Sequence, residues 1–138
     1  MSGERLFLDT AFVQALLNRH DQYHHQALAL FSRVQGAAEV WITEAVLVEI
    51  GNALSAFRRD GAVAFVEQCY QTANMRVVSV DTPLLLRALQ LYRSRPDKTW
   101  GLTDCISFVV MQEHELTDAV TTDQHFVQAG FRAVLLEG

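Results

Sequence analysis

Short apolar segments alternate with longer stretches of helical periodicity along this chain, and this alternation restricts the fold more than any other feature. We expect strands at residues 5–8, 39–43, 76–80, 118–122 and 133–137. Strands that alternate with helices pair mainly in parallel, because each connecting helix packs on a face of the sheet. The sequence therefore predicts an α/β fold, with a central and mainly parallel β-sheet flanked by helices on both faces.

Polar residues suited to helix starts follow several of these strands. A first helix follows Asp9, and Asp21 can cap a second one that stops at Gly36. Thr43 can cap a long helix that ends at Asp60 and Gly61. Later helices are expected to open at the Thr82 and Pro83 pair and at the cap Thr103, and a last helical turn spans residues 124–130.

The spacing of apolar residues predicts which side of each helix is buried. For the helices after Asp21, Thr43 and Thr82, the residues expected to face the core include Leu28 and Phe31, then Phe57, then Leu85, Leu86, Leu89 and Tyr92.

The length of 138 residues suits one domain, and we expect a single domain over residues 1–138. No apolar run reaches the roughly 18 residues that a membrane span needs, and the first ten residues lack a basic segment followed by a long apolar one. These features predict a cytoplasmic protein. Cys69 and Cys105 form no C-x-x-C pair, and we expect both to be buried thiols.

Several carboxylates directly follow an expected strand or lie in an early turn of an expected helix. Asp9, Asp81 and Asp123 follow predicted strands, and Asp104 lies in the first turn of a helix. Glu49 lies in the second turn of the helix after Thr43, on the flank of its apolar stripe, where we expect it to be partly buried. Because the carboxyl ends of parallel strands meet at one edge, several of these acids are expected to converge there.

Converging carboxylates repel one another by several kcal/mol per close pair, so such a cluster needs a cation or a proton. Oxygen ligands without cysteine or histidine nearby suit Mg²⁺ or Mn²⁺ rather than zinc. Ions of this kind cleave phosphodiesters by activating water and offsetting charge on the leaving oxygen. Taken singly, each acid also has a structural explanation as a helix cap or a first-turn charge.

The chain is acidic, with 11 Lys plus Arg against 16 Asp plus Glu and a net charge of −5. It therefore lacks the overall basic field of a non-specific duplex binder. Local cations, namely Arg58 and Arg59, and then Arg93, Arg95 and Lys98, are either solvated helix ends or contacts to nucleic acid.

The densest group of ligand-type residues is the stretch RHDQYHH at residues 19–25. Asp21 is interpreted there as a helix cap, and His24 and His25 follow each other in the first turn. Successive helical positions point about 100° apart, so these two histidines are poorly placed to share one ion. We expect this stretch to be structural.

The ordered set of acids resembles a PIN domain, in particular the VapC-type toxins of bacterial type II toxin–antitoxin systems. The resemblance runs nearly from end to end, through FLDT at residues 7–10, TEAVLVEIGNAL at 43–54 and WGLTDCISFVVMQEHELTDAVTTDQHFVQAGF at 100–131. Asp9, Glu49, Asp104 and Asp123 match the four acids of the family. Gln124 and His125 stand where many members carry a further acid, and Asp81 lies outside the set and is interpreted as a cap.

The resemblance implies a metal-dependent endoribonuclease in which Asp9, Glu49, Asp104 and Asp123 bind Mg²⁺ or Mn²⁺ and catalyse hydrolysis of RNA. Thr10, Thr103 and Thr121 supply hydroxyls that could hold these carboxylates, and Arg93, Arg95 and Lys98 are the candidate RNA contacts. It also implies a cognate antitoxin that inhibits the site with a basic side chain, and a homodimer.

Two alternatives stay open. One is a PIN-like module that has lost catalysis and acts through protein contacts alone. The other is a small-molecule phosphohydrolase with Asp9 as an aspartyl nucleophile. The second aspartate that such enzymes usually carry two residues later is absent, since position 11 is alanine.

Overall fold

Five strands form one sheet, and all of their pairings are parallel. The computed structural model describes residues 3–137. In the order β3-β2-β1-β4-β5, the sheet contains β1 (Arg5–Leu8), β2 (Glu39–Thr43), β3 (Met75–Val78), β4 (Asp118–Val120) and β5 (Arg132–Ala133). Strand β1 lies at the centre, with Phe7 opposite Trp41 on β2 and Ala119 on β4. The predicted α/β fold with a central parallel sheet is confirmed.

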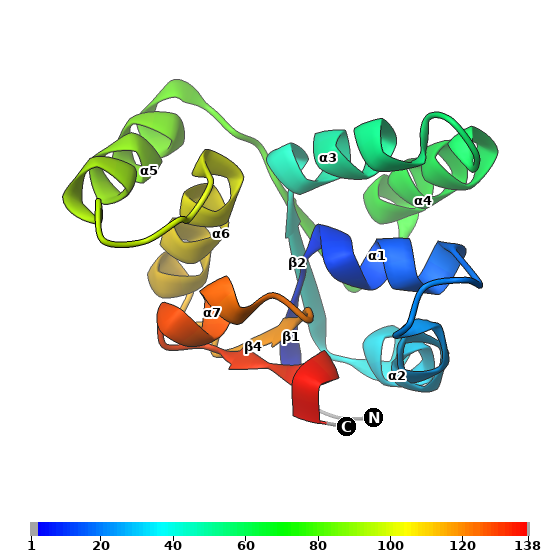
Figure 1. Ribbon diagram of the computed structural model, residues 1–138. Helices are drawn as coiled ribbons and strands as arrows, with labels where there is room; N and C mark the ends of the chain where they lie inside the picture. Colours follow the sequence, from blue (N-terminus) through cyan, green and yellow to red (C-terminus); the bar gives the residue numbers. More distant parts are fainter. Residues whose placement is uncertain (1–2, 138) are drawn as a thin grey trace.

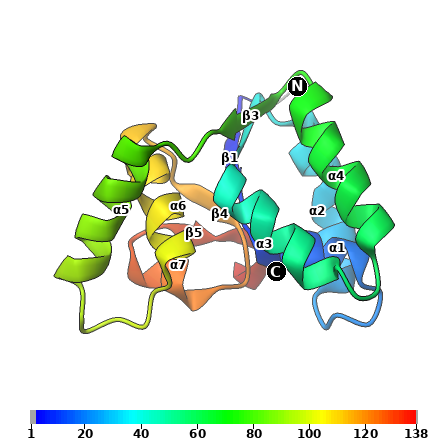
Figure 2. The same cartoon turned by 90° about the horizontal axis from the view of Figure 1, so that it is seen from above.

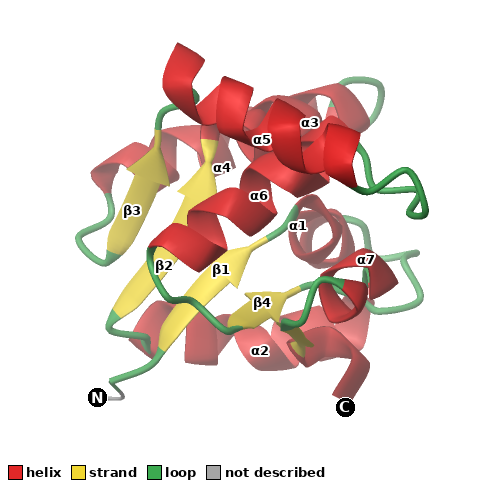
Figure 3. Cartoon of the chain, turned by 90° about the vertical axis from the view of Figure 1, so that its left-hand side faces the viewer, coloured by secondary structure: helices red, strands yellow, loops and turns green. Residues whose placement is uncertain are grey.

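Helices cover both faces of this sheet. They are α1 (Thr10–Leu17), α2 (His24–Gly36), α3 (Glu44–Leu54), α4 (Arg59–Gln71), α5 (Thr82–Ser94), α6 (Leu102–Glu113) and α7 (Gln124–Gln128). In Figure 1, α5 and α6 lie on one side of the strands and α1, α2 and α4 on the other. The same division is visible from above in Figure 2. Figure 3 faces the side that α5 and α6 cover, with β3, β2, β1 and β4 behind them.

The core is richest where α6 crosses the sheet. Seven consecutive residues of α6, from position 105 to position 111, are buried. Phe108 on α6 packs edge-on against Phe126 on α7, with ring centroids 5.0 Å apart, and Phe126 lies 6.3 Å from Phe7 on β1. Full burial of one such side chain stabilises the fold by roughly 1.5–3 kcal/mol, so these rings fix α6 and α7 firmly against the central strand.

Several predicted boundaries are wrong by a few residues. Strand β3 ends at Val78 and β4 at Val120, which is earlier than expected. The last strand comprises only Arg132 and Ala133, and a 3-10 helix follows over Val134–Glu137. Strands β4 and β5 pair over two positions only.

Two of the predicted helix boundaries also differ. Helix α2 begins at His24, and Asp21 instead accepts a hydrogen bond from the backbone N–H of Tyr23 in the preceding turn. The helix capped by Thr43 ends at Leu54, so Asp60 lies in the first turn of α4. The predicted caps Thr43 and Asp81 are confirmed, because their side chains accept hydrogen bonds from Val46 N and Leu84 N.

The predicted burial of α5 is wrong. Leu84 and Ala88 face the core, whereas Leu85, Leu86, Leu89 and Tyr92 are 39%, 58%, 37% and 49% exposed. Phe57 is also exposed, as are Leu28 and Phe31 on α2. The helical spacing therefore identified a real apolar stripe on α5, but this stripe faces solvent and not the core.

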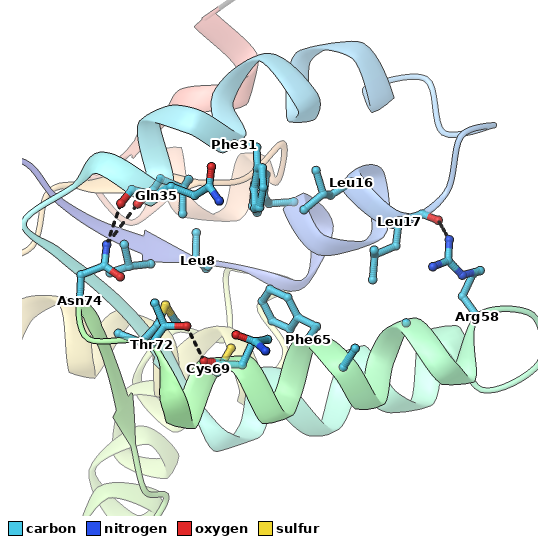
Figure 4. Close-up of a pocket in the computed structure, with 17 residues that line it drawn as sticks. Leu8, Leu16, Leu17, Phe31, Gln35, Arg58, Phe65, Cys69, Thr72 and Asn74 are labelled. Atoms are coloured by element: carbon cyan, nitrogen blue, oxygen red, sulfur yellow. Dashed lines mark hydrogen bonds between the residues drawn. The ribbon is translucent and has the colours of Figure 1, made fainter.

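An apolar cavity of about 390 Å³ opens between α2 and α4, and Phe12, Leu16 and Leu17 of α1 also line it. Leu16, Phe31 and Phe65 approach each other across it, while Arg58 closes one end by donating to the carbonyl oxygen of Leu17 (Figure 4). The cysteine in its lining, Cys69, is a buried free thiol, and burial raises its pKa to about 12. The Cys69 thiol is therefore protonated at neutral pH and poorly suited to act as a nucleophile. None of the helices within residues 3–137 combines the length and apolarity needed to cross a bilayer.

Candidate active site

Four predicted acids line one cavity at the carboxyl edge of the sheet. The cavity has a volume of about 620 Å³, and Asp9, Glu49, Asp104 and Asp123 all contribute to its wall. They come from the end of β1, the second turn of α3, the first turn of α6 and the residue before α7. The acids lie together because the parallel strands β1 and β4 are neighbours and end at the same edge of the sheet, and α3 and α6 both begin near that edge.

Asp9 is the most buried of the four, with 6% of its surface exposed. It occupies the N-cap position of α1, yet its side chain makes no capping bond there. Burial raises the pKa of Asp9 from its ordinary 3.8 to about 6, hydrogen bonds from Thr121 and Thr10 oppose that rise, and the charges of Asp104 and Asp123 add to it. A carboxylate in this setting is destabilised unless positive charge is supplied.

Two of the predicted hydroxyls hold the acids in place. Oγ1 of Thr121 donates to Oδ2 of Asp9 at 2.8 Å and accepts from the backbone N–H of Asp123 at 3.0 Å. Oγ1 of Thr10 donates to Oε1 of Glu49, also at 2.8 Å. The Thr121–Asp9 and Thr10–Glu49 bonds join residues that are distant in sequence, so the threonines fix the relative positions of the acids as well as their orientation.

Thr103 does not have the expected role. Gly101 is the N-cap of α6, and Thr103 falls inside the first helical turn, outside the lining of the acidic cavity. The start of α6 is held instead by Asp104, whose Oδ2 accepts the backbone N–H of Gly101 at 3.1 Å. Glycine offers no side chain to cap the helix, so a residue of the first turn reaches back to the chain before it.

The structure adds a residue that the sequence interpretation left out of the site. Nδ1 of His125 lies 2.9 Å from Oδ2 of Asp104 and 3.4 Å from Oδ1 of Asp123. Among residues 3–137, the one group of at least three potential metal ligands with mutually close donor atoms is Asp104, Asp123 and His125. The premise that no histidine lies near the acids was therefore wrong. The signal was available, because His125 follows Asp123 by two residues in the expected last helix.

The candidate RNA contacts line a neighbouring cavity of about 400 Å³. Arg93, Arg95 and Lys98 contribute to it, together with Thr99 and Cys105, the residue after Asp104. The guanidinium of Arg95 binds both carboxylate oxygens of Asp97 and lies 5.0 Å from the ring centre of Trp100. These three cations therefore come from the end of α5 and the loop before α6, and their cavity reaches the residue next to Asp104.

The histidine-rich stretch at residues 19–25 makes no comparable group in the described chain. Nδ1 of His24 lies 2.7 Å from the carbonyl oxygen of Ala15, which ties α2 to α1. The rings of His24 and His25 are 5.9 Å apart and inclined by 60°. The contact of His24 fits the structural role that the sequence predicts for this stretch.

Three solved structures resemble this fold over most of its length. The first is VapC20 from Mycobacterium tuberculosis, described as a sarcin–ricin loop cleaving toxin, with 26% identity, a TM-score of 0.83 and coverage of 93% of this chain and 97% of that one. The second is VapBC2 from Rickettsia felis bound to a DNA fragment from its promoter, with 14% identity, a TM-score of 0.62, and coverage of 91% and 93%. The third is FitAcB from Neisseria gonorrhoeae, with 16% identity, a TM-score of 0.66, and coverage of 94% and 98%.

No curated protein matched the chain in sequence. A model of the PIN domain matches residues 6–132, which include all four acids and every strand except the first residue of β1 and the last residue of β5. The resemblance drawn from the sequence motifs is thereby confirmed, and the chain belongs to the PIN-domain family.

Proposed function

We propose that this protein is an endoribonuclease that hydrolyses phosphodiester bonds of RNA at the acidic cavity, and that it is the toxin of a toxin–antitoxin pair. The observation that carries the proposal is the convergence of Asp9, Glu49, Asp104 and Asp123 on one cavity. Membership of the PIN-domain family and the likeness to VapC20, a sarcin–ricin loop cleaving toxin, support the choice of RNA as substrate.

The donor set fits a divalent cation. Four carboxylates offer hard oxygen ligands. Burial raises the pKa of Asp9, and the negative charges of Asp104 and Asp123 raise it further, so a bound cation would stabilise the ionised form of Asp9. We assign the binding of Mg²⁺ or Mn²⁺ to Asp9, Glu49, Asp104 and Asp123. Such an ion would supply Lewis-acid activation of water and of the scissile phosphate.

The protein's own residues prepare the cavity for that chemistry. Thr121 and Thr10 hold Asp9 and Glu49 by hydrogen bonds, so little reorganisation is needed when substrate arrives. The phosphates of RNA are repelled by uncompensated carboxylates, and Arg93, Arg95 and Lys98 offer local positive charge that offsets this repulsion. The acidic net charge of the chain is therefore compatible with an RNA substrate.

A cognate antitoxin and a second copy of the chain are the proposed partners. The antitoxin follows from the resemblance to VapC-type toxins. The exposed apolar stripe of α5, formed by Leu85, Leu86, Leu89 and Tyr92, supports self-association, because contiguous exposed apolar side chains mark interaction surfaces.

The experiment is an RNA cleavage assay with purified, antitoxin-free protein and structured RNAs, including an oligonucleotide of the sarcin–ricin loop. We expect cleavage in Mg²⁺ or Mn²⁺ that EDTA abolishes, and at least a roughly hundredfold loss in Asp104→Asn. Asp60→Asn is the matched control, because Asp60 is an exposed acid at the start of α4. Undiminished cleavage by Asp104→Asn would contradict the assignment. Absence of cleavage by the unmodified chain, together with absence of metal binding, would favour the catalytically silent binding module.

A further inference from the structure

His125 is held at the acidic cavity from two directions. Its backbone N–H donates to Oδ1 of Asp123 at 2.8 Å, which fixes the first turn of α7. Its ring then extends to Asp104, which lies at the start of α6 and is 21 residues away in sequence. One edge of the imidazole therefore faces carboxylates from two separate elements.

The other edge of the ring has a partner of its own. Nε2 of His125 lies 3.2 Å from Oγ1 of Thr99, in the loop before α6. Histidines that bind a metal ion through one nitrogen usually donate the N–H of the other nitrogen to a nearby acceptor, and this contact fixes the tautomer. With Thr99 as that acceptor, Nδ1 carries a lone pair and faces two carboxylate oxygens. Three lone pairs directed at one another are stable only when a cation or a proton lies among them.

The separations suit ligands of one ion. Nδ1 of His125 lies 2.9 Å from Oδ2 of Asp104 and 3.4 Å from Oδ1 of Asp123. Two donors at right angles around an ion, each at about 2.1 Å, are about 3 Å apart. The same distances also fit a simple hydrogen bond from a protonated Nδ1 to Asp104. The two tautomers are therefore distinguished by whether a bound ion is coordinated by the imidazole nitrogen.

We propose that His125 is a ligand of the divalent ion at this cavity, together with Asp104 and Asp123, and that its imidazole nitrogen makes the site favour Mn²⁺ over Mg²⁺. Imidazole is a good ligand for transition metals, whereas Mg²⁺ prefers oxygen donors and gives up its water reluctantly. The inference rests on the proposed function only for the presence of an ion at the acids, and it concerns which atoms bind that ion.

The test is pulsed electron paramagnetic resonance of Mn²⁺ added to the metal-stripped protein, prepared once with ordinary and once with ¹⁵N-labelled histidine. We expect a nitrogen hyperfine coupling that changes with the isotope and that disappears in His125→Asn. Asparagine keeps an N–H that can reach Asp104 but removes the imidazole nitrogen. His25→Ala is the matched control, because His25 is an exposed histidine in the first turn of α2.

Titration calorimetry of the same proteins gives the selectivity. His125→Asn should weaken Mn²⁺ binding about tenfold or more while changing Mg²⁺ binding much less. The inference is overturned if Mn²⁺ binds to the unmodified protein without a histidine coupling, or if His125→Asn keeps the full preference for Mn²⁺. Circular dichroism establishes that the variant is folded.

The results that would contradict the proposed nuclease function differ from those that would contradict the role of His125. RNA cleavage without a nitrogen coupling to Mn²⁺ would refute the role of His125 and leave the nuclease standing. A coupling to His125 in a protein that cleaves no RNA would refute the nuclease and leave the metal ligand standing.

Discussion

The hydroxyl of Thr121 donates a 2.8 Å hydrogen bond to Oδ2 of Asp9, although 112 residues separate the two in sequence. Both side chains are buried, and the bond connects the residue after β1 with the residue after β4. It also opposes the rise in the pKa of Asp9 that burial causes. Thr121, one of the three hydroxyls that the sequence offered for holding the acids, thus partly offsets the effect of burial on the most buried acid in the cavity.

Replacing Thr121 by valine should destabilise the metal-free protein at neutral pH by about 1–3 kcal/mol, because Asp9 loses its side-chain partner while remaining buried. Urea unfolding monitored by circular dichroism measures the change. Ser107→Ala is the matched control, since within the described residues the buried Oγ of Ser107 has no hydrogen-bond partner. That variant should be neutral or slightly more stable. Equal losses in the two variants would contradict the role of the Thr121 bond.

Asp9 should make the metal-free protein less stable as pH rises from about 4 to about 6. Between its ordinary pKa of 3.8 and its folded pKa of about 6, the folded state holds a proton that the unfolded chain has released. The unfolded state therefore binds fewer protons, and the free energy of unfolding falls with pH in this window. Above it the full penalty, on the order of 3 kcal/mol, is present.

Asp9→Asn removes this pH dependence and should raise the stability of the metal-free protein above about pH 6, with no gain below about pH 4. The measurement is urea unfolding in EDTA across that range. Added Mn²⁺ should stabilise the unmodified protein more than the variant, because the variant lacks one carboxylate ligand. A pH profile that is the same in both proteins would refute the assigned pKa.

Arg93, at the end of α5, and Arg95, in the loop before α6, should contribute unequally to RNA affinity. Arg95 is already paired with Asp97, whereas within residues 3–137 Arg93 forms no ion pair. Arg93→Ala should therefore raise KM for RNA several-fold with kcat unchanged, and should reduce the salt dependence of binding by about one counterion. Arg95→Ala should do less, and Arg59→Ala on α4 serves as the control. Equal effects of all three substitutions would mean that Arg93 and Arg95 contribute no more to RNA binding than a cation elsewhere on the surface.

The exposed stripe on α5 should be the site of dimer formation. Leu86 is 58% exposed, and Leu86→Glu should shift a dimer toward monomer in sedimentation velocity, because it places a charge in an apolar contact. Leu28→Glu, on α2 at 49% exposure, is the control and should leave the dimer intact. A monomeric unmodified protein, or equal dissociation by both variants, would rule out this surface.

The residues at strand ends were predictable because their positions follow from local patterns. Strand β1 is a four-residue run that ends before Asp9, and Thr43 both ends β2 and caps α3. Parallel pairing then places both ends at one edge of the sheet, so convergence of the acids followed without knowledge of the contacts.

The surface assigned to α5 was not predictable from periodicity. Two apolar stripes run along this helix, and both have helical spacing. Only the packing of α5 against α6 decides that Leu84 and Ala88 face inward, and that contact depends on residues far away in sequence.

His125 was missed for a similar reason. Its side-chain partners, Asp104 and Thr99, precede it by more than twenty residues, and no local pattern links them. The break after Leu54 was missed because the following residues contain neither proline nor an early glycine, so nothing in the local sequence marks an end to the helix.

The wide spread of the acids, from position 9 to position 123, has a consequence for how the protein is made. Strand β1 leaves the ribosome well before its partner β4, because most of the strands and helices lie between them in sequence. A nascent chain that has not yet released residue 123 lacks one carboxylate and one side of the central strand. A complete site therefore cannot assemble until residue 123 has been released, and a product that ends before that residue cannot carry all four acids.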